Sequence, residues 1–313
     1  MIKKIKILYV AGMGRSGSTL LTNLLHQIEG FSNIGELYYI WERGFQENRL
    51  CGCGVPFALC QFWEGIIQHA QQGLPDFDPQ EMAQLTHKLA RSRHLPLMMT
   101  GIGRQWLDMQ SLIYRTWLAQ LYQAIQNVNQ SRVLVDASKF PSYAFHLSRM
   151  PSIELYLLHL VRDPRAVAYS WQRKRINPDS QRPMGRMSIA KSALMWRMWN
   201  QSIESISQTL PDPQHYMRLR YEDFVDHPEL NFQQLCAFLN EPLALHEITN
   251  ALAQQPQENH AIAGNPARFQ QDGFKIKSDN TWQTEMSTIQ KFQVKCLTGS
   301  LQSKYNYDKI NVL

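Results

Sequence analysis

A glycine- and serine-rich segment near the start of the chain has the composition of a phosphate-binding loop. Residues 12–19 read GMGRSGST, with the glycine spacing of a Walker A loop and Thr19 at the position of its magnesium-binding hydroxyl. Ser18, however, stands where that loop needs lysine. Backbone N–H groups at such a turn bind phosphate without the lysine, and Arg15 supplies a cation that can donate to two phosphate or sulfate oxygens. The segment therefore predicts an anion site that lacks the lysine needed to reach a γ-phosphate.

A second candidate anion site follows a buried strand later in the chain. Residues 157–170 read LLHLVRDPRAVAYS, and Arg162 closes a strand predicted over 153–161 at the sheet edge where open α/β folds bind ligands. Ser170 lies eight residues further on, just over two helical turns away and on roughly the face that Arg162 adjoins. The alternative for Arg162 is a surface ion pair with Asp163. Two anion sites on one sheet edge suit a nucleoside 3′,5′-bisphosphate and fit ATP poorly.

The elements that must position these residues alternate between strand and helix. Short apolar runs predict strands over 6–11, 132–135, 153–161 and 215–220, and apolar residues at helical spacing predict helices over 20–28, 106–128, 188–210 and 228–239. Another helix is expected to begin at Pro164, with Asp163 as its N-cap. After Ala253 the chain is rich in Gln, Asn, Gly and Pro, and we expect loops with one late helix there. This order predicts an α/β fold, a three-layer parallel sheet of P-loop type.

The whole chain, 1–313, is expected to be a single domain with a mainly helical insertion at about 43–130 that helps to cover the site. Within the insertion, Trp106 and Trp117 recur on the apolar face of the helix predicted over 106–128, and we expect these tryptophans to pack in the core.

The charge balance favours an anionic ligand. The chain has a formal net charge of +6 and a pI of about 9.0. The adjacent cations Arg173, Lys174 and Arg175 are expected to form a solvated basic face. Basic residues are not interleaved with an aromatic platform of any recognised module, so we expect no nucleic-acid partner.

The sequence also predicts a compartment. No apolar stretch approaches the ~20 residues that span a bilayer, and the apolar run at 7–12 is too short for the core of a signal peptide. The five cysteines are an odd number. These features predict a cytoplasmic protein with no membrane span and mostly free thiols.

Three of the cysteines lie close together in the sequence. Cys51, Cys53 and Cys60 fall within ten residues, and His69 is the nearest downstream histidine that could complete a zinc site. No second paired motif accompanies them, so we expect no metal and passive thiols. The spacing leaves a metal site and a disulfide open as alternatives.

The two anion motifs together resemble those of the PAPS-dependent sulfotransferases, which transfer the sulfuryl group of 3′-phosphoadenosine 5′-phosphosulfate. The core Arg15-Ser16-Gly17-Ser18-Thr19 is similar to the loop that holds the 5′-phosphosulfate, in the arginine version found in carbohydrate and tyrosylprotein sulfotransferases. Arg162 and Ser170 match the pair that holds the 3′-phosphate. The resemblance extends from the first strand to about Trp282.

The resemblance also implies roles for four further residues. Glu36, in a Gly-Glu pair twenty-one residues beyond Arg15, matches the base of the tyrosylprotein branch, and Lys139 matches the lysine that supports the sulfuryl group. Tyr221, in a Tyr-Glu-Asp run, matches a tyrosine near the nucleotide, and Arg268 lies in a run similar to a loop that closes over the 3′-phosphate. The cytosolic branch has its catalytic histidine where this chain has Pro141, which favours Glu36 as the base.

The implied activity is transfer of the sulfuryl group from PAPS to a hydroxyl acceptor, an alcohol, sugar, lipid or phenol, with PAP as product and no metal required. The alternative is a P-loop kinase, because residues 132–136 read RVLVD and resemble a Walker B strand with Asp136 as its carboxylate. A third possibility is a non-catalytic module that senses PAP. The arginine-loop branches are usually Golgi membrane proteins, whereas no anchor is predicted here, so the resemblance does not carry over their acceptor.

Overall fold

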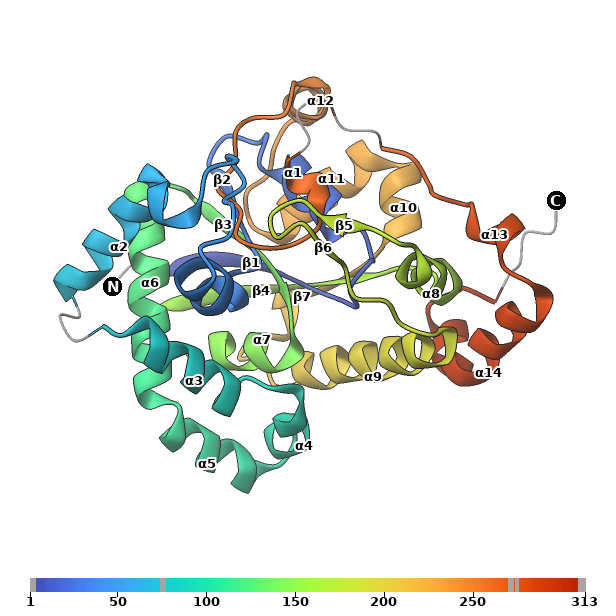
Figure 1. Cartoon of the computed structure of the whole chain (residues 1–313), viewed down its shortest axis with the longest axis horizontal. Helices are drawn as coiled ribbons and strands as arrows, with labels where there is room; N and C mark the ends of the chain where they lie inside the picture. Colours follow the sequence, from blue (N-terminus) through green and yellow to red (C-terminus); the bar gives the residue numbers. More distant parts are fainter. Residues whose placement is uncertain (1–3, 74–76, 270–272, 274–275, 309–313) are drawn as a thin grey trace.

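A five-stranded parallel sheet forms the centre of the molecule (Figure 1). The computed structural model describes residues 4–73, 77–269, 273 and 276–308. The strand order is β2-β3-β1-β4-β7, and every neighbouring pair is parallel. The strands span β1 Ile5–Ala11, β2 Phe31–Gly35, β3 Val133–Lys139, β4 Ile153–Val161 and β7 Tyr216–Arg220. The predicted α/β fold with a parallel sheet is confirmed.

Helices cover both faces of the sheet because its strands are apolar on both sides. In β1, Ile5, Ile7 and Tyr9 contribute to one core cluster, whereas Leu8 and Val10 contribute to the other. The first cluster is completed by α2 Gln61–Gly73, α3 Pro79–Leu89, α4 Leu95–Met98, α5 Gly101–Gln110, α6 Leu112–Asn129, α7 Pro141–Ser148 and α9 Ile189–Ser207. The second is completed by α1 Ser18–Leu25, α10 Tyr221–Asp226, α11 Pro228–Phe238 and α12 Leu245–Ala253.

The remaining elements lie beside the sheet, around α8 Pro164–Gln172 (Figure 1). α8 begins as predicted, with Pro164 at its first position and the Asp163 side chain accepting a hydrogen bond from the Arg165 N–H. A small antiparallel hairpin follows it, with strands β5 Ile176–Asn177 and β6 Arg182–Pro183. The last two helices of the chain are α13 Trp282–Glu285 and α14 Thr288–Lys304. Among the described helices, none combines the length and the apolar composition needed to cross a membrane.

The helix predicted over 106–128 is in fact two helices. α5 ends at Gln110, and α6 begins at Leu112 after a break at Ser111. The break changes which residues face the core: Trp117 is 9% exposed, but Trp106 is 43% exposed and Met109 is 71% exposed. The expectation that both tryptophans are core residues was therefore wrong for Trp106, because helical periodicity does not reveal a change of helix axis.

Two buried histidines should make the fold sensitive to mild acid. Burial lowers the pKa of His146 to about 3 and that of His159 to about 4. Both rings therefore stay neutral in the folded chain at pH 5, whereas the unfolded chain protonates them near pH 6.5. Between pH 7 and pH 5 the free energy of unfolding should fall by about 4 kcal/mol from these two rings. Burial also raises the pKa of Asp136 to about 6, and its proton uptake on folding offsets about 1 kcal/mol of that loss.

Urea unfolding at the two pH values measures the change in stability. NMR of the histidine rings measures its cause: the rings of His146 and His159 should remain neutral at pH 5. Titration of both rings near pH 6.5 would contradict this account.

Candidate functional site

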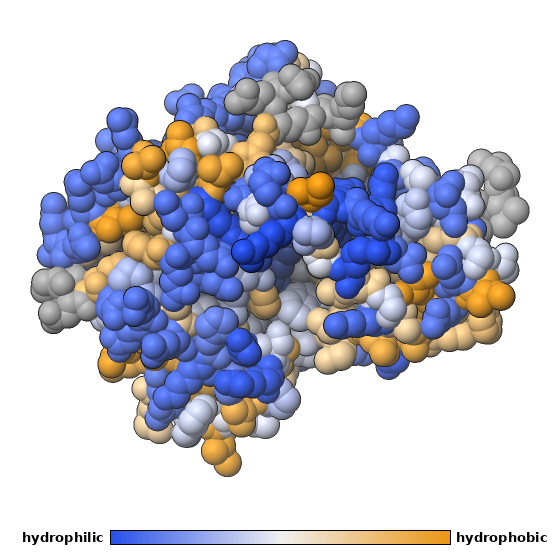
Figure 2. All heavy atoms as spheres, in the orientation of Figure 1, coloured by the Kyte–Doolittle hydropathy of each residue, from blue (hydrophilic) through white to orange (hydrophobic). Residues whose placement is uncertain are grey.

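A cavity of about 670 Å³ opens where the first four strands of the chain end. Its lining includes Gly12 after β1, Glu36 after β2, Lys139 at the end of β3 and Arg162 after β4. Figure 2 shows hydrophilic residues gathered around a hollow on this face. The carboxyl edge of a parallel sheet is where α/β folds bind ligands, so the cavity is the candidate active site.

The segment over residues 12–19 forms a tight turn between β1 and α1. Arg15 and Gly17 both have left-handed backbone conformations, with φ of 77° and 91°. A Cβ atom added to Gly17 would lie 2.2 Å from the ring of Tyr221, and one added to Gly12 would lie 2.4 Å from the carbonyl oxygen of Leu160. Glycine is therefore required at Gly17 by both conformation and close packing, and at Gly12 by close packing. The first N–H groups of α1 point out of the helix end, as a phosphate-binding turn needs.

Gly17→Ala should weaken both the fold and the anion site. The new methyl group would displace the Tyr221 ring and strain a left-handed residue, at a cost of about 1–3 kcal/mol in unfolding free energy. A nucleoside 3′,5′-bisphosphate should bind at least about tenfold more weakly, which a calorimetric titration measures. Gly185→Ala is the matched control, because Gly185 lines the same cavity and an added Cβ would contact nothing within 4 Å. Equal affinities of the two variants would argue against a role for the turn.

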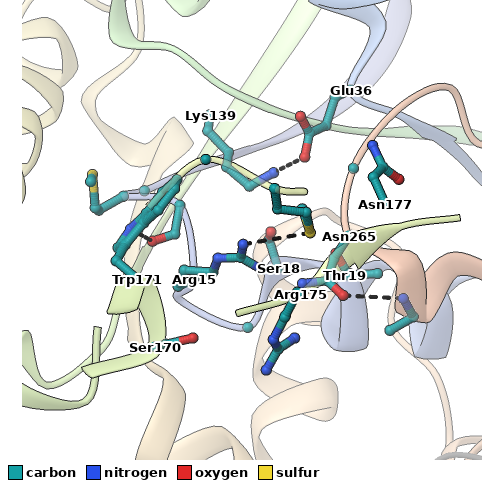
Figure 3. A pocket seen from close by; sticks show the side chains of 18 of the residues that line it. Arg15, Ser18, Thr19, Glu36, Lys139, Ser170, Trp171, Arg175, Asn177 and Asn265 are labelled. Atoms are coloured by element: carbon teal, nitrogen blue, oxygen red, sulfur yellow. Dashed lines mark hydrogen bonds and ion pairs between the residues drawn. The ribbon is translucent and has the colours of Figure 1, made fainter. Parts of the chain in front are cut away.

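Arg15 extends from this turn into the cavity (Figure 3). Its guanidinium lies 5.0 Å from the ring centre of Trp171, and Nη2 lies 3.7 Å from the sulfur of Met184. Trp171 is itself fixed by a 3.1 Å hydrogen bond from its indole nitrogen to the Gly14 carbonyl. Burial, and then the nearby Arg175, lower the pKa of Arg15 to about 10. Among the described residues no carboxylate hydrogen-bonds to Arg15, so an anionic ligand would complete its surroundings.

Arg162 adjoins this turn from the end of β4. Its Nη1 donates to the Arg15 carbonyl at 3.1 Å, and its guanidinium lies 4.6 Å from the Tyr221 ring centre. Arg162 is only 8% exposed, and its Nε is buried without a hydrogen-bond partner in the described structure. A buried N–H group without an acceptor lowers the free energy of unfolding, and a ligand oxygen that accepts its hydrogen bond would remove this cost. Ser170, on α8, is also buried and lines the same cavity (Figure 3).

The neighbours of Arg162 account for two further predicted features. Asp163 pairs with Arg165 at 2.6 Å, so the alternative of an ion pair between Asp163 and Arg162 is wrong. Tyr221 does not line the cavity. It lies behind Gly17 and against the Arg162 guanidinium, where it supports both.

Glu36 and Lys139 form an ion pair across the cavity from Arg15 (Figure 3). Their side chains are only 13% and 15% exposed. Glu36 follows Gly35, whose φ of 78° redirects the chain at the end of β2. The Lys139 Nζ also donates to the Ala137 carbonyl at 3.0 Å, and the Trp199 indole nitrogen donates to the Lys139 carbonyl at 3.1 Å. The structure thus brings together a carboxylate and an ammonium group that lie 103 residues apart.

Asp136, the carboxylate of the Walker B resemblance, is fully buried below the cavity floor and is not among its lining residues. The Tyr122 hydroxyl donates to it at 2.5 Å and the Ser138 N–H at 2.8 Å. Burial raises the pKa of Asp136 to about 6. A carboxylate enclosed in this way cannot reach a metal bound to a nucleotide in the cavity, so the kinase alternative loses its support.

Arg268 supports the cavity wall from behind. It is 2% exposed, and its Nη2 donates to Asp179 at 2.8 Å and to the Leu50 carbonyl at 3.0 Å. Its Nη1 donates to the Gly264 carbonyl at 3.3 Å. Arg268 is not a lining residue, whereas its neighbour Ala267 is. These hydrogen bonds tie Arg268 to the loop that forms this wall.

Several lining residues were not predicted. Arg175 lines the cavity, which corrects the expectation that residues 173–175 form only a solvated basic face. The hairpin β5–β6 places Arg175 and Arg182 over the anion site, and nothing in their local sequence predicts that hairpin. Other unpredicted lining residues include Arg43, Arg49, Trp171, Met184, Trp199 and Asp279.

Comparisons with known proteins point to one family. Residues 8–244 match the profile of the sulfotransferase family. The sulfotransferase domain from the Synechococcus PCC 7002 olefin synthase is 21% identical, with a TM-score of 0.56 over 98% of this chain and 97% of that chain. The sulfotransferase domain from the curacin biosynthetic pathway is 22% identical, with a TM-score of 0.55 over 98% of this chain and 99% of that one.

At these identities the two structures show a shared fold. No curated protein matches the sequence significantly. The family match is the stronger finding, because it spans far more than half of the chain and contains both the loop at Arg15 and the strand end at Arg162. The chain therefore belongs to the sulfotransferase family, and it is a sulfotransferase enzyme.

Proposed function

We propose that this enzyme takes its sulfuryl group from PAPS and transfers it to a hydroxyl group. The observation that carries the proposal is that the turn at Arg15 and the buried Arg162, whose Nε has no partner in the described structure, line one cavity together with Ser170. Seven cationic residues line the cavity against two acidic ones, Glu36 and Asp279. That excess of positive charge suits a ligand that carries a phosphate at each end, as PAPS does.

The 5′-phosphosulfate would lie on the turn formed by Arg15, Ser16, Gly17, Ser18 and Thr19. Ser16 has a buried hydroxyl without a partner among the described residues, which fits a ligand oxygen. The 3′-phosphate would be bound by Arg162 and Ser170, and the unpaired Arg162 Nε offers it a donor. Tyr221 would position both sites from behind, and Arg268 would act only through the loop it holds.

The reaction is an in-line displacement at sulfur. The acceptor oxygen forms a bond to sulfur while the bond from sulfur to the phosphate oxygen breaks, and PAP leaves with that oxygen. Negative charge grows on the leaving phosphate and persists on the sulfuryl oxygens, so fixed donors there lower the barrier. Arg15, Lys139 and the N–H groups of the turn are placed for this task.

Glu36 would take the proton of the acceptor hydroxyl as that oxygen attacks. The carboxylate lies in the cavity and beside Lys139. Its ion pair with Lys139 holds the base and the sulfuryl-stabilising group in contact before the substrates arrive. In this proposed reaction, the base and the donors that stabilise the negative charge are all side chains or backbone N–H groups of this chain.

The acceptor side of the cavity is largely apolar. Phe140, at the start of α7, and Trp199, on α9, pack together with ring centres 5.4 Å apart beside Lys139. Tyr39, Met187 and Met195 also line the cavity. We propose that the acceptor presents its hydroxyl group to Glu36 from an apolar body, as in a phenol or a lipid alcohol. We also propose that the chain is a single domain in which residues 43–130 form an insertion. The expectation that its helices cover the site is corrected, because Arg43 and Arg49 line the cavity whereas no residue of α2–α6 does so in the described structure.

Incubation of the purified chain with PAPS and a panel of alcohols, phenols, sugars and lipid alcohols tests this proposal. PAP release that depends on the acceptor, with the mass of the acceptor increased by one sulfuryl group, is the expected result. ATP with magnesium in place of PAPS is the control and should yield no modified acceptor. Phosphorylated acceptor in that control, and none sulfated with PAPS, would overturn the proposal.

A further inference from the structure

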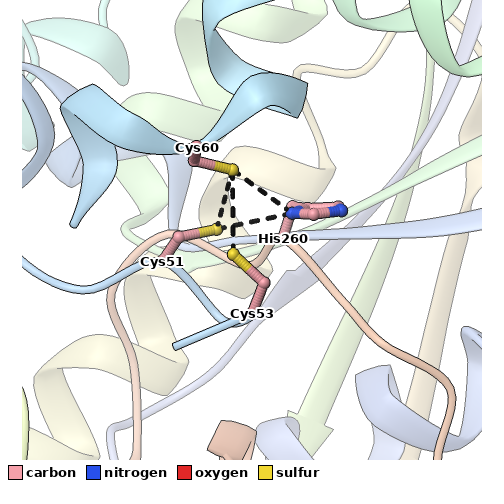
Figure 4. A group of neighbouring side chains, drawn as sticks. All are labelled: Cys51, Cys53, Cys60 and His260. Carbon is pink, nitrogen blue, oxygen red and sulfur yellow. Dashed lines mark hydrogen bonds between the residues drawn. The ribbon is translucent and has the colours of Figure 1, made fainter. Parts of the chain in front are cut away.

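Three cysteines and one histidine converge on a single point away from the catalytic cavity (Figure 4). The sulfur of Cys60 lies 3.6 Å from that of Cys51 and 3.8 Å from that of Cys53. The Nδ1 atom of His260 lies 3.6 Å from the Cys51 sulfur and 3.4 Å from the Cys60 sulfur. All four donor atoms lie within 4.8 Å of one another, and all three cysteines are free thiols.

These separations are those of four ligands around one zinc ion. A zinc ion at about 2.3 Å from sulfur and about 2.0 Å from nitrogen has tetrahedral edges of about 3.8 Å between sulfurs and about 3.5 Å between sulfur and nitrogen. The four separations given above agree with these values to within a few tenths of an ångström. The remaining two, from Cys53 to Cys51 and to His260, are no longer than 4.8 Å. We propose that Cys51, Cys53, Cys60 and His260 bind a structural zinc ion.

Backbone hydrogen bonds fix the turn that carries the first two thiols. Cys51 and Val55 close a turn, with the Cys51 N–H donating to the Val55 carbonyl at 2.8 Å. The Gly54 N–H donates back to the Cys51 carbonyl at 2.9 Å, and Gly54 has a φ of 88° that favours glycine. The turn therefore presents Cys51 and Cys53 on the same side, and Cys60 reaches them from the start of α2.

The histidine is oriented independently of the thiols. Its ring stacks on Phe62 with centres 4.4 Å apart and planes 8° apart. The Trp63 indole nitrogen donates to the His260 carbonyl at 3.0 Å. The Gly52 N–H donates to the Ala261 carbonyl at 3.1 Å, which ties the cysteine turn directly to the histidine segment. Since ring and backbone are both fixed, Nδ1 points toward the thiols as a ligand atom would.

The ligand set indicates a structural ion and not a catalytic one. Three cysteines and one histidine fill the four positions of a tetrahedral zinc ion and leave none for water or substrate. None of the four residues is among those lining the catalytic cavity in the described structure. The short separations suit one ion, whereas a polynuclear iron–sulfur cluster spreads its thiolates over several iron atoms.

The spacing of the motif explains why the sequence did not reveal this site. His69, the nearest downstream histidine, lies elsewhere, with its Nε2 3.0 Å from the Asn127 side chain. His260 is 200 residues beyond Cys60. The fold alone brings it to the thiols.

The ion would brace the strand end that carries Glu36. Two residues after His260, Ile262 pairs with Gly35, and its carbonyl accepts a 2.6 Å hydrogen bond from the Glu36 N–H. The Ile262 N–H donates to the Ile34 carbonyl at 3.1 Å. Gly264, two residues further on, lines the cavity beside Glu36. A zinc ion at the four ligands thus joins the 51–60 segment to the wall of the active site.

Metal analysis of the purified full-length chain, after incubation with zinc and removal of the excess, tests the proposal. The expected result is about one zinc ion per chain in the parent and in Cys296→Ser, whose cysteine is exposed and far from the cluster in sequence. Cys53→Ser and His260→Ala should retain less than about a tenth of that zinc. Cys53 is chosen because it is only partly buried, so the change to serine leaves the core intact.

Two further readouts keep the test decisive if a variant folds poorly. Cobalt added to the chelated parent should give the absorption bands of a tetrahedral thiolate site, and zinc should abolish them. Removal of zinc should lower Tm in the parent and leave it unchanged in Cys53→Ser. The proposal would be overturned if the parent chain bound neither zinc nor cobalt, or if Cys53→Ser bound as much zinc as Cys296→Ser. A disulfide between Cys51 and Cys60 in the zinc-treated parent would also overturn it.

Discussion

Arg162→Ala is expected to weaken PAP binding by at least about 100-fold. The guanidinium is almost fully buried, and its Nε has no partner in the described structure until a ligand supplies one. Charge-assisted hydrogen bonds from a buried arginine to phosphate are among the strongest that a site can offer. Removing them should raise the dissociation rate of PAP more than it lowers the association rate. Isothermal titration with PAP measures the loss.

Arg197→Ala is the control for this substitution. Arg197 lies exposed on α9 and does not line the cavity, so its loss changes the net charge by the same amount without touching the site. Its PAP affinity should stay within about twofold of the parent. If the two variants lost PAP affinity equally, the loss in Arg162→Ala would come from the change in net charge. That result would contradict the assignment of Arg162 to the second phosphate site.

Glu36→Gln is expected to lower kcat by about 10²–10⁴-fold while the Kd for PAP stays close to that of the parent. Glutamine keeps the shape of the side chain and can still lie beside Lys139, but it cannot accept the acceptor proton. The backbone hydrogen bond from residue 36 to Ile262 is unaffected, so the strand end should hold its position. Steady-state turnover with saturating PAPS and a hydroxyl acceptor measures kcat.

The pH profile distinguishes a base from a merely structural residue. If a side chain removes the acceptor proton in the rate-limiting step, the pH profile of the parent should differ in shape from that of the residual activity of Glu36→Gln. Glu64→Gln, at an exposed position on α2, is the matched control and should keep both kcat and the profile. Full activity of Glu36→Gln would leave the base unassigned, because no other carboxylate among the described lining residues lies beside Lys139.

The parts of the site that could be predicted from the sequence are those set by local chemistry. The turn at residues 12–19 places Arg15 and Gly17 in left-handed backbone conformations. Glycine adopts this conformation without strain, so a glycine-rich turn can be recognised from a single segment of the sequence. Arg162 was found because it follows a continuous apolar strand and precedes an Asp-Pro helix start. Both features specify the end of a strand, and the ends of parallel strands meet at one edge.

The parts that escaped prediction depend on contacts between distant segments. β2 reads FSNIG, too short and too polar in the middle to predict a strand, yet it is fully buried because β3 pairs with it. Arg175 reaches the cavity only because a two-stranded hairpin turns it inward. Trp106 shows the opposite error, since its spacing fits a core helix that in the structure ends at Gln110. Tertiary pairing decided each of these cases.

The central claim, that the cavity binds a nucleoside 3′,5′-bisphosphate, is tested most directly by thermal unfolding of the purified chain with PAP and, in parallel, with ATP and magnesium. A ligand at 100 times its Kd adds about 2.7 kcal/mol to the free energy of unfolding. PAP should raise Tm accordingly without any added metal, and ATP with magnesium should leave it nearly unchanged. Stabilisation by ATP with magnesium but not by PAP would contradict the account.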